Sequence, residues 1–298
     1  MSEDAPVQTL AAGACRKLVP LPAPDANKYS RGVLAVVGGS AAYPGAPIMA
    51  ARAAMRAGAG YARLFVPEQA AQTARAHLLS IPVEACTQTA CGSFDPECAD
   101  TLIAAAAKAD AFAVGPGMGT SASAAEFFVH FLQALHDRGD TRPILFDADA
   151  LNVLAAHPEL SSLRAGCDDV LTPHEGEAAR LLGRRVADRL ADARELAGRY
   201  GATVVLKGPR TLIVGSDGRA AVHVEAGPEL AKAGTGDVLA GIVGALCAQG
   251  LCGFDAGCLG VFVHGRAGSL AAREMSVVSV VAEDIIESIG PAFVSMGA

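Results

Sequence analysis

Apolar and polar positions alternate along the chain in two recurring patterns. One pattern is a short, nearly continuous apolar run that ends in glycine or polar residues, at 32–40, 61–68, 109–119, 143–149 and 169–174. The other is an Ala-rich segment with helical spacing of its apolar positions, at 46–60, 69–79, 121–137 and 175–183, with a shorter segment from Asp149. Buried parallel strands have such apolar runs, and helices connect them. The alternation therefore predicts right-handed βαβ units, with helices on both faces of a parallel sheet.

The pattern changes between residues 202 and 227. Three runs typical of strands follow one another there, at 202–208, 211–218 and 219–227. The turn residues Ser216-Asp217-Gly218 favour a hairpin, so we predict an antiparallel edge on the parallel sheet. Three more helices are predicted after this edge, at 235–249, 254–273 and 281–289. We interpret the Pro- and Ala-rich residues 1–27 as an N-terminal arm and residues 28–298 as one domain.

Composition narrows the class of protein. Half of the 298 residues are hydrophobic, Trp is absent, and 24 basic residues against 31 acidic ones give a net charge of -7. This balance offers no electrostatic footprint for nucleic acid or an anionic membrane. The N-terminus lacks the basic and apolar regions of a secretory signal, and the apolar segment 238–248 is shorter than the roughly 20 residues that span a bilayer. We therefore expect a cytoplasmic enzyme that binds neither nucleic acid nor membranes.

Glycine and polar residues gather where the predicted strands end. The strand ends read GGS at 38–40, GPGMG at 115–119, DAD at 147–149, TPHEGE at 172–177 and KG at 207–208. In a parallel α/β sheet, ligands bind beyond the carboxyl ends of the strands. The sequence therefore predicts a binding site at this edge of the sheet.

The stretch KAGTGDVLAG at 232–241 carries the most specific chemistry. Gly234 and Gly236 lie where a helix begins, and the free N–H groups and positive dipole end of a helix suit a phosphate. Asp237 follows at once. It could cap the helix, but a carboxylate beside a phosphate is electrostatically unfavourable unless chemistry requires it. We favour a general base that takes a proton from an attacking hydroxyl while the N–H groups stabilise a transferring phosphoryl group.

Two other strand ends allow a structural and a functional interpretation. His174 and Glu177 could form an N-terminal cap, or His174 could donate to a substrate while Glu177 organises water or a metal ion. Asp149 could cap the next helix while Asp147 faces the cleft. Lys207, at a strand end, could meet a phosphate as a point charge or be an ordinary solvated residue.

Taken together and in order, six motifs resemble a known family. The GxGD anion hole, here Gly234 to Asp237, is similar to that of the ribokinase-like superfamily, whose NxxE motif becomes HxxE at His174 to Glu177. The full set resembles the ADP-dependent NAD(P)H-hydrate dehydratases over about residues 28–290: GGSAAYPGAP, GPGMG, DADALN, TPHEGE, KGPRT and AGTGDVLAGI. The resemblance implies a three-layer αβα fold with a mainly parallel central sheet and an antiparallel edge.

The resemblance also implies an activity. The expected reaction is dehydration of the S epimer of hydrated NADH or NADPH, with ADP as phosphoryl donor and AMP and phosphate as products. Mg²⁺ is expected to accompany the nucleotide. A homotetramer is expected, and a separate protein is expected to interconvert the substrate epimers.

Site residues follow from the same resemblance, position by position. Asp237 is expected to be the catalytic base, and Glu177 to contact the metal through water. The hydrated-nicotinamide site is expected to include Ala46, Gly117, His174 and Asp237. The adenine nucleotide is expected to contact Lys207, Gly208, Pro209, Arg210, Thr211, Gly234, Thr235 and Gly236.

One departure and two alternatives accompany this interpretation. The family's usual GNPxMAT before the anion hole is AGPELAK here, which places Glu229 and Lys232 near the nucleotide. The first alternative is a small-molecule kinase of the same superfamily that phosphorylates a hydroxymethyl group on a vitamin precursor. The second is an adenylate-binding regulatory module without turnover. Asp237 argues against the module, since binding alone needs no base.

Overall fold

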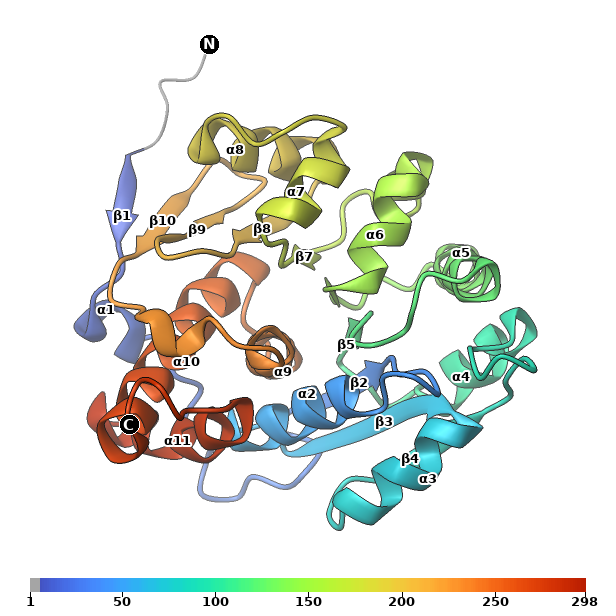
Figure 1. Ribbon diagram of the computed structural model, residues 1–298, viewed down its shortest axis with the longest axis horizontal. Helices are drawn as coiled ribbons and strands as arrows, with labels where there is room; N and C mark the ends of the chain where they lie inside the picture. The colour runs from blue at the N-terminus through green and yellow to red at the C-terminus, as the bar shows by residue number, and fades with distance from the viewer. Residues whose placement is uncertain (1–5) are drawn as a thin grey trace.

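A ten-stranded sheet runs through the molecule in the order β1-β10-β9-β8-β7-β6-β5-β2-β3-β4 (Figure 1). The computed structural model describes residues 6–298. The strands are β1 (Val7–Thr9), β2 (Val33–Val37), β3 (Tyr61–Pro67), β4 (Val83–Cys86), β5 (Ala111–Val114), β6 (Ile144–Phe146), β7 (Val170–Leu171), β8 (Thr203–Leu206), β9 (Thr211–Val214) and β10 (Ala220–His223). Only β9 pairs antiparallel with its neighbours, β8 and β10. The mainly parallel sheet with antiparallel pairing near one end is thus confirmed.

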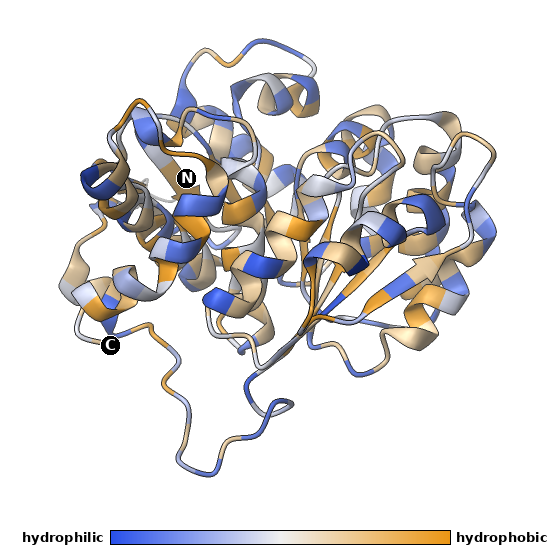
Figure 2. Cartoon of the chain, turned by 60° about the horizontal axis from the view of Figure 1, so that its bottom comes forward, coloured by the Kyte–Doolittle hydropathy of each residue, from blue (hydrophilic) through white to orange (hydrophobic). Residues whose placement is uncertain are grey.

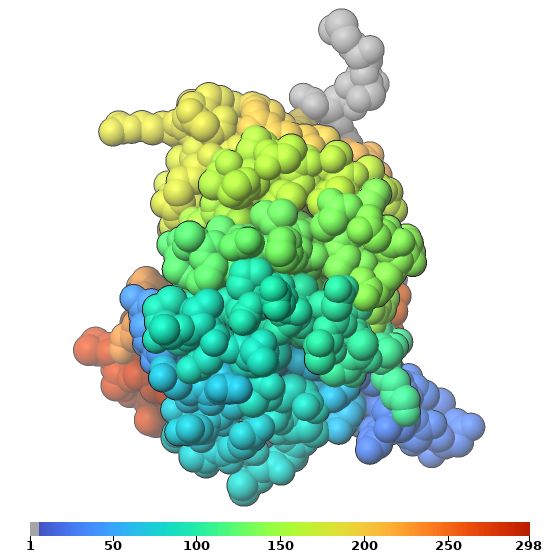
Figure 3. Space-filling view, turned by 90° about the vertical axis from the view of Figure 1, so that its right-hand side faces the viewer, coloured from blue at the N-terminus to red at the C-terminus, as the bar shows by residue number. Residues whose placement is uncertain are grey.

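Helices cover both faces of the sheet (Figure 1). One layer holds α1 (Ala12–Arg16), α2 (Gly45–Arg56), α3 (Glu68–His77), α9 (Thr235–Ala248), α10 (Gly253–Met275) and α11 (Ala282–Ser295). The other holds α4 (Ala99–Ala105), α5 (Ala122–Asp137), α6 (Asp149–Ala156), α7 (Glu175–Leu182) and α8 (Arg189–Tyr200). Figure 3 shows segments of this second layer stacked in chain order. Short 3₁₀ helices lie at η1 (Pro96–Cys98), η2 (Pro158–Arg164) and η3 (Pro228–Leu230).

Side-chain alternation along the strands builds two cores, one on each face. In β2, Leu34 and Val36 join the core under α2 and α9, while Val33, Ala35 and Val37 face the α5 side. Hydrophobic colour follows the strands in Figure 2. Small residues let the helices approach closely: a β-carbon at Gly241 of α9 would overlap the carbonyl of Ala50 in α2. The Ala- and Gly-rich composition is therefore what allows this tight packing.

The structure also contains elements that the periodicity did not reveal. Strand β4, the short helix α4 and helix α8 have no counterpart among the predicted elements. Within the segment interpreted as an arm, β1 pairs parallel with β10, and Cys15 of α1 is buried. Residues 1–5 of that arm lie outside the described residues. Within residues 6–298, no helix combines the length and hydropathy needed to cross a bilayer.

Candidate active site

The predicted strand ends meet at one edge of the sheet. The N–H of Gly39, after β2, donates to the carbonyl of Pro116, after β5, at 2.8 Å. The N–H of Gly119 donates to Oδ2 of Asp149, after β6, at 2.8 Å. Beyond β8, the N–H of Lys207 donates to the carbonyl of Pro173, after β7, at 2.8 Å. Because these strands are parallel, their carboxyl ends form one continuous polar edge, as the sequence predicts.

Lys207 lies at the centre of this edge. Its Nζ is 2.8 Å from Oδ1 of Asp147 and 3.8 Å from Oε2 of Glu177. The same Oδ1 of Asp147 also accepts a hydrogen bond from Thr172 Oγ1 at 2.8 Å. Burial alone lowers the pKa of Lys207, but the nearby carboxylates outweigh it, so the pKa is raised and the ammonium stays charged. Lys207 is therefore a partly buried cation among carboxylates and not a solvated surface residue.

Asp237 lies in the first turn of α9, behind a glycine turn. Gly234 precedes the helix with a φ of +89°, and a β-carbon there would be 2.8 Å from Cε of Met49. The left-handed φ therefore favours glycine at this position. The N–H of Thr235 donates to the carbonyl of Lys232 at 3.4 Å. The N–H groups of Gly236 and Asp237 lie in the first turn, where a helix offers no partner for them, so these two are available to an anion.

The charges around Asp237 change its protonation. Burial raises the pKa of Asp237 to about 7, and the carboxylate of Asp147 acts in the same direction. Asp149 and Glu177 add smaller increases, and only Lys207 lowers the value. A carboxylate whose pKa lies near neutrality is suited to proton transfer at that pH. The site therefore supplies a proton acceptor directly beside an anion-binding helix terminus.

His174 and Glu177 form a reciprocal cap on α7. Nδ1 of His174 accepts from the N–H of Gly176 at 2.9 Å, and Oε2 of Glu177 accepts from the N–H of His174 at 2.8 Å. Because Nδ1 is an acceptor, the proton of the neutral ring is on Nε2, in a side chain that is 55% exposed. The structural interpretation of TPHEGE therefore holds, and within this cap Nε2 of His174 lies 3.5 Å from Oε1 of Glu177. Burial raises the pKa of Glu177, while Lys207 opposes the shift.

Ala46 and Gly117 adjoin each other. Gly117 has a φ of +66°, and a β-carbon there would lie 3.1 Å from Cβ of Ala46. The carbonyl of Gly117 accepts from Ser40 Oγ at 2.9 Å, which joins the strand ends GGS and GPGMG. These two expected nicotinamide contacts are thus placed together, on α2 and on the loop after β5.

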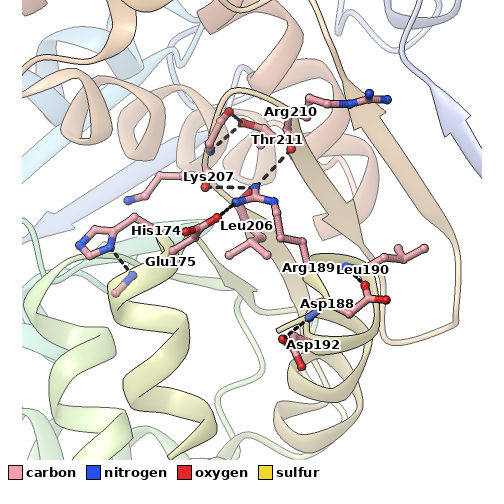
Figure 4. Close-up of polar contacts among 12 residues, drawn as sticks. His174, Glu175, Asp188, Arg189, Leu190, Asp192, Leu206, Lys207, Arg210 and Thr211 are labelled. Carbon is pink, nitrogen blue, oxygen red and sulfur yellow. Dashed lines mark hydrogen bonds and ion pairs between the residues drawn. The ribbon is translucent and has the colours of Figure 1, made fainter. Parts of the chain in front are cut away.

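A pocket of about 470 Å³ opens beside Lys207 and the start of α9. The predicted nucleotide contacts that line it are Lys207, Gly208, Pro209, Thr211, Thr235 and Gly236. The remaining lining is mostly apolar, from Ala226, Pro228, Leu230 and Leu239 among others. Arg210 instead borders a separate hollow with β1, and its side chain points away from Lys207 and His174 (Figure 4). The family resemblance placed Arg210 among the nucleotide contacts, but in this structure its side chain is outside the pocket.

Arg189 supports the wall of this pocket and was missed by the sequence interpretation. Its guanidinium forms an ion pair with Glu175 and donates to the carbonyls of Leu206, Lys207 and Arg210 (Figure 4). Arg189 therefore fixes the turn that follows β8. Arg189 is the first residue of α8. Because this helix was not predicted, nothing in the sequence indicated that Arg189 lies near the site.

The two residues of the AGPELAK departure do not line the pocket. Glu229 is buried, and its Oε1 accepts from the N–H of Gly227 at 3.2 Å and from Ser269 Oγ at 3.4 Å. Nζ of Lys232 donates to the carbonyl of Val278 at 2.7 Å. Both side chains therefore hold the loop before α9 in place. Within residues 6–298, no group of three or more His, Cys, Asp or Glu side chains is arranged to hold a metal ion.

Comparison with known proteins agrees with this geometry. The Carb_kinase family, described as NAD(P)H-hydrate dehydratase, matches residues 34–291. A bifunctional NAD(P)H-hydrate repair enzyme of Salinibacter ruber is 39% identical over 279 residues, which are 93% of this chain and 51% of that protein. An ADP-dependent (S)-NAD(P)H-hydrate dehydratase of Neisseria meningitidis serogroup B is 38% identical over 264 residues, which are 86% and 83% of the two chains. The chain thus spans about half the length of the bifunctional relatives it matches.

The fold also matches solved structures. An ADP/ATP-dependent NAD(P)H-hydrate dehydratase from Bacillus subtilis, co-crystallised with ATP and Mg²⁺, superposes with a TM-score of 0.79 at 24% identity. The superposition covers 98% of this chain and 99% of that one. At this identity the likeness shows the fold, and the ribokinase-like architecture is confirmed.

Proposed function

The chain belongs to the NAD(P)H-hydrate dehydratase family, and on that basis we propose that it dehydrates the S epimer of hydrated NADH and NADPH with ADP as phosphoryl donor. The observation that carries the proposal is the position of Asp237, a partly buried carboxyl with a pKa of about 7 in the first turn of α9. A helix terminus with free N–H groups binds a phosphate, and the acid beside it accepts a proton.

In the proposed reaction, Asp237 takes the proton of the ring hydroxyl as its oxygen attacks the terminal phosphorus of ADP. The bond from that phosphorus to the bridging oxygen breaks, and AMP leaves with the electron pair. N–H groups at the start of α9 donate to the transferring oxygens. Phosphate then leaves the ring with the C–O electron pair as the ring nitrogen releases its lone pair, and loss of a ring C–H proton restores the dihydronicotinamide.

In this proposal the two reactants bind in different regions of the site. The nucleotide lies in the 470 Å³ pocket, where Lys207 meets its phosphates. The hydrated ring lies toward Ala46 and Gly117, with Nε2–H of His174 as a donor. The expected contacts through Gly208, Pro209, Thr211 and Gly236 are supported by their place in the pocket wall.

Mg²⁺ would accompany the nucleotide phosphates, whose charge it neutralises when bound. Mg²⁺ keeps several waters and needs one or two carboxylates from the protein. Glu177 would make a contact through water, from a carboxylate that the cap on α7 holds in place. We also propose a homotetramer and a separate epimerase for the R epimer, both from the family resemblance.

Dehydration is preferred to the kinase alternative because of the HxxE motif and the relatives. A hydroxymethyl kinase and a dehydratase share the anion hole, but the Neisseria relative is named for dehydration. The test is to incubate the protein with ADP and hydrated NADH and to follow absorbance of the dihydronicotinamide. Recovery of NADH with equal amounts of AMP and phosphate is expected. A phosphorylated product that accumulates without NADH would contradict the proposal.

A further inference from the structure

Arg189 is the first residue of α8, at the end where the dipole of a helix disfavours a positive charge. The start of this helix is already formed by its N-cap, Asp188, whose side chain accepts hydrogen bonds from the N–H groups of Leu190 and Ala191. The helix itself therefore gives no reason for an arginine at this position. The guanidinium instead extends to the turn that follows β8 (Figure 4).

Three main-chain carbonyls of that turn converge on one nitrogen atom. Nη2 of Arg189 lies 3.1 Å from the carbonyl oxygen of Leu206, 3.3 Å from that of Lys207 and 3.2 Å from that of Arg210. Carbonyl oxygens carry partial negative charge, so three of them gathered around one point repel each other unless a cation lies between them. The geometry of the turn therefore depends on the charge of Arg189.

The guanidinium is also held from its other side. Nη1 of Arg189 forms an ion pair with Glu175, the first residue of α7. A β-carbon at Gly208 would lie 2.7 Å from Nη2, so the guanidinium packs directly against the backbone of the turn. Arg189 therefore connects the turn to the starts of both α7 and α8 (Figure 4).

This turn forms one wall of the pocket assigned to the nucleotide. Lys207, Gly208, Pro209 and Thr211 line the pocket, whereas Arg189 lies behind them and borders the separate hollow with β1. We propose that Arg189 is a positioning residue, which sets the affinity for the adenine nucleotide by holding these four residues in the conformation that binds it. The inference rests on the proposed function for the identity of the ligand.

Arg199, near the other end of α8, provides a matched control. It also joins α8 to α7, since its Nη1 donates to the carbonyl of Leu181 at 2.7 Å, and its Nη2 forms an ion pair with Glu195. Its side chain is 38% exposed, against 27% for Arg189. Neither partner belongs to the turn after β8, so a substitution of Arg199 removes a comparable contact between the helices without releasing the turn.

The experiment measures ADP binding by titration calorimetry of the full chain and, separately, KM for ADP and for hydrated NADH. Arg189→Met and Arg189→Gln are both expected to bind ADP about tenfold more weakly than the wild type, because neither side chain brings a cation to the three carbonyls. KM for ADP should rise by the same factor, while KM for hydrated NADH should change by less than about twofold.

Two further variants complete the test. Arg189→Lys keeps a charged donor and is expected to recover most of the affinity for ADP. Arg199→Met is expected to bind ADP as the wild type does. Either neutral variant of Arg189 is sufficient alone, so the test does not depend on both of them folding.

Three results would overturn the inference. One is a folded neutral variant of Arg189 that binds ADP as tightly as the wild type. Another is an Arg199→Met protein that loses as much affinity for ADP as Arg189→Met does. The third is an Arg189→Lys protein that binds ADP no more tightly than the neutral variants. The expected order of affinities without recovery of NADH by the wild type would support the inference and contradict the proposed function instead. A wild type that binds no ADP would contradict both.

Discussion

Two ion pairs lie at opposite ends of the parallel strands and differ in their balance of charge. Arg164 and Asp169, before β7, pair through two hydrogen bonds of 2.8 and 2.9 Å, with both side chains 4% exposed. Asp169 also accepts from the N–H of Ile144. At the carboxyl ends of the strands, Lys207 and Asp147 lie 2.8 Å apart, with side chains 19% and 2% exposed.

Each pair meets the cost of burial differently. Arg164 donates its remaining N–H groups to the carbonyls of Asp140 and Arg142, so one cation meets one carboxylate with a full set of partners. Lys207 is instead one cation among several carboxylates, including Glu177 and Asp237. The excess negative charge adds to burial in holding a proton on Asp237 up to near-neutral pH. Saturated pairing produces rigidity, and incomplete pairing produces a group able to exchange protons.

The largest expected effect is on catalysis. Asp237→Asn should lower kcat by about 10² to 10⁴, because the hydroxyl loses its proton acceptor while the N–H groups remain. Recovery of NADH from hydrated NADH measures the loss, and calorimetry with ADP serves as the control for nucleotide binding. Near-normal kcat in the variant would remove Asp237 from its assigned role.

At the other end of the strands, before β7, Arg164→Leu should lower the free energy of unfolding by about 3–5 kcal/mol. The substitution leaves Asp169 buried and uncompensated, which is the costly way to break such a pair. Urea unfolding followed by circular dichroism measures the change. The double variant with Asp169→Leu should recover part of the loss. A single variant as stable as the wild type would contradict the expected cost of leaving Asp169 unpaired.

The same Asp237→Asn change should stabilise the protein at high pH. The folded-state pKa of about 7 lies above the ordinary value of 3.8, so the folded form binds the proton more tightly. Ionisation therefore costs stability, and this cost grows as pH rises from about 4 through 7. The variant should be about 2–4 kcal/mol more stable at pH 8 and nearly equal at pH 4. A difference between the two proteins that does not depend on pH would contradict the shifted pKa.

A smaller effect is expected on the pH profile. In the wild type, kcat/KM should fall below a pH of about 7 as Asp237 takes up its proton. Lys207→Met removes the one cation that lowers the pKa of Asp237, so the acidic limb should move upward by about one unit. Lys207→Arg keeps the charge and should leave the limb near its original position. An unmoved limb in Lys207→Met would separate Lys207 from the titration of Asp237.

The sequence predicted the strand ends and the anion hole because both follow from local patterns. Apolar runs of four to seven residues reveal buried strands, and Gly234 is required at its turn by a φ of +89°. The charge balance around Lys207 could not be predicted from the sequence. Asp147 and Lys207 are 60 residues apart, and only the order of the strands in the sheet brings them together.

The pairing of β1 with β10 has a consequence for the handling of this protein. Val7 to Thr9 cover the last hydrogen-bonding row of the sheet on that side. A shortened chain that starts after Leu10 would leave the N–H and C=O groups of β10 bare, and such an edge recruits other strands. Trimming these leading residues would therefore promote aggregation even though they lie far from the chemistry.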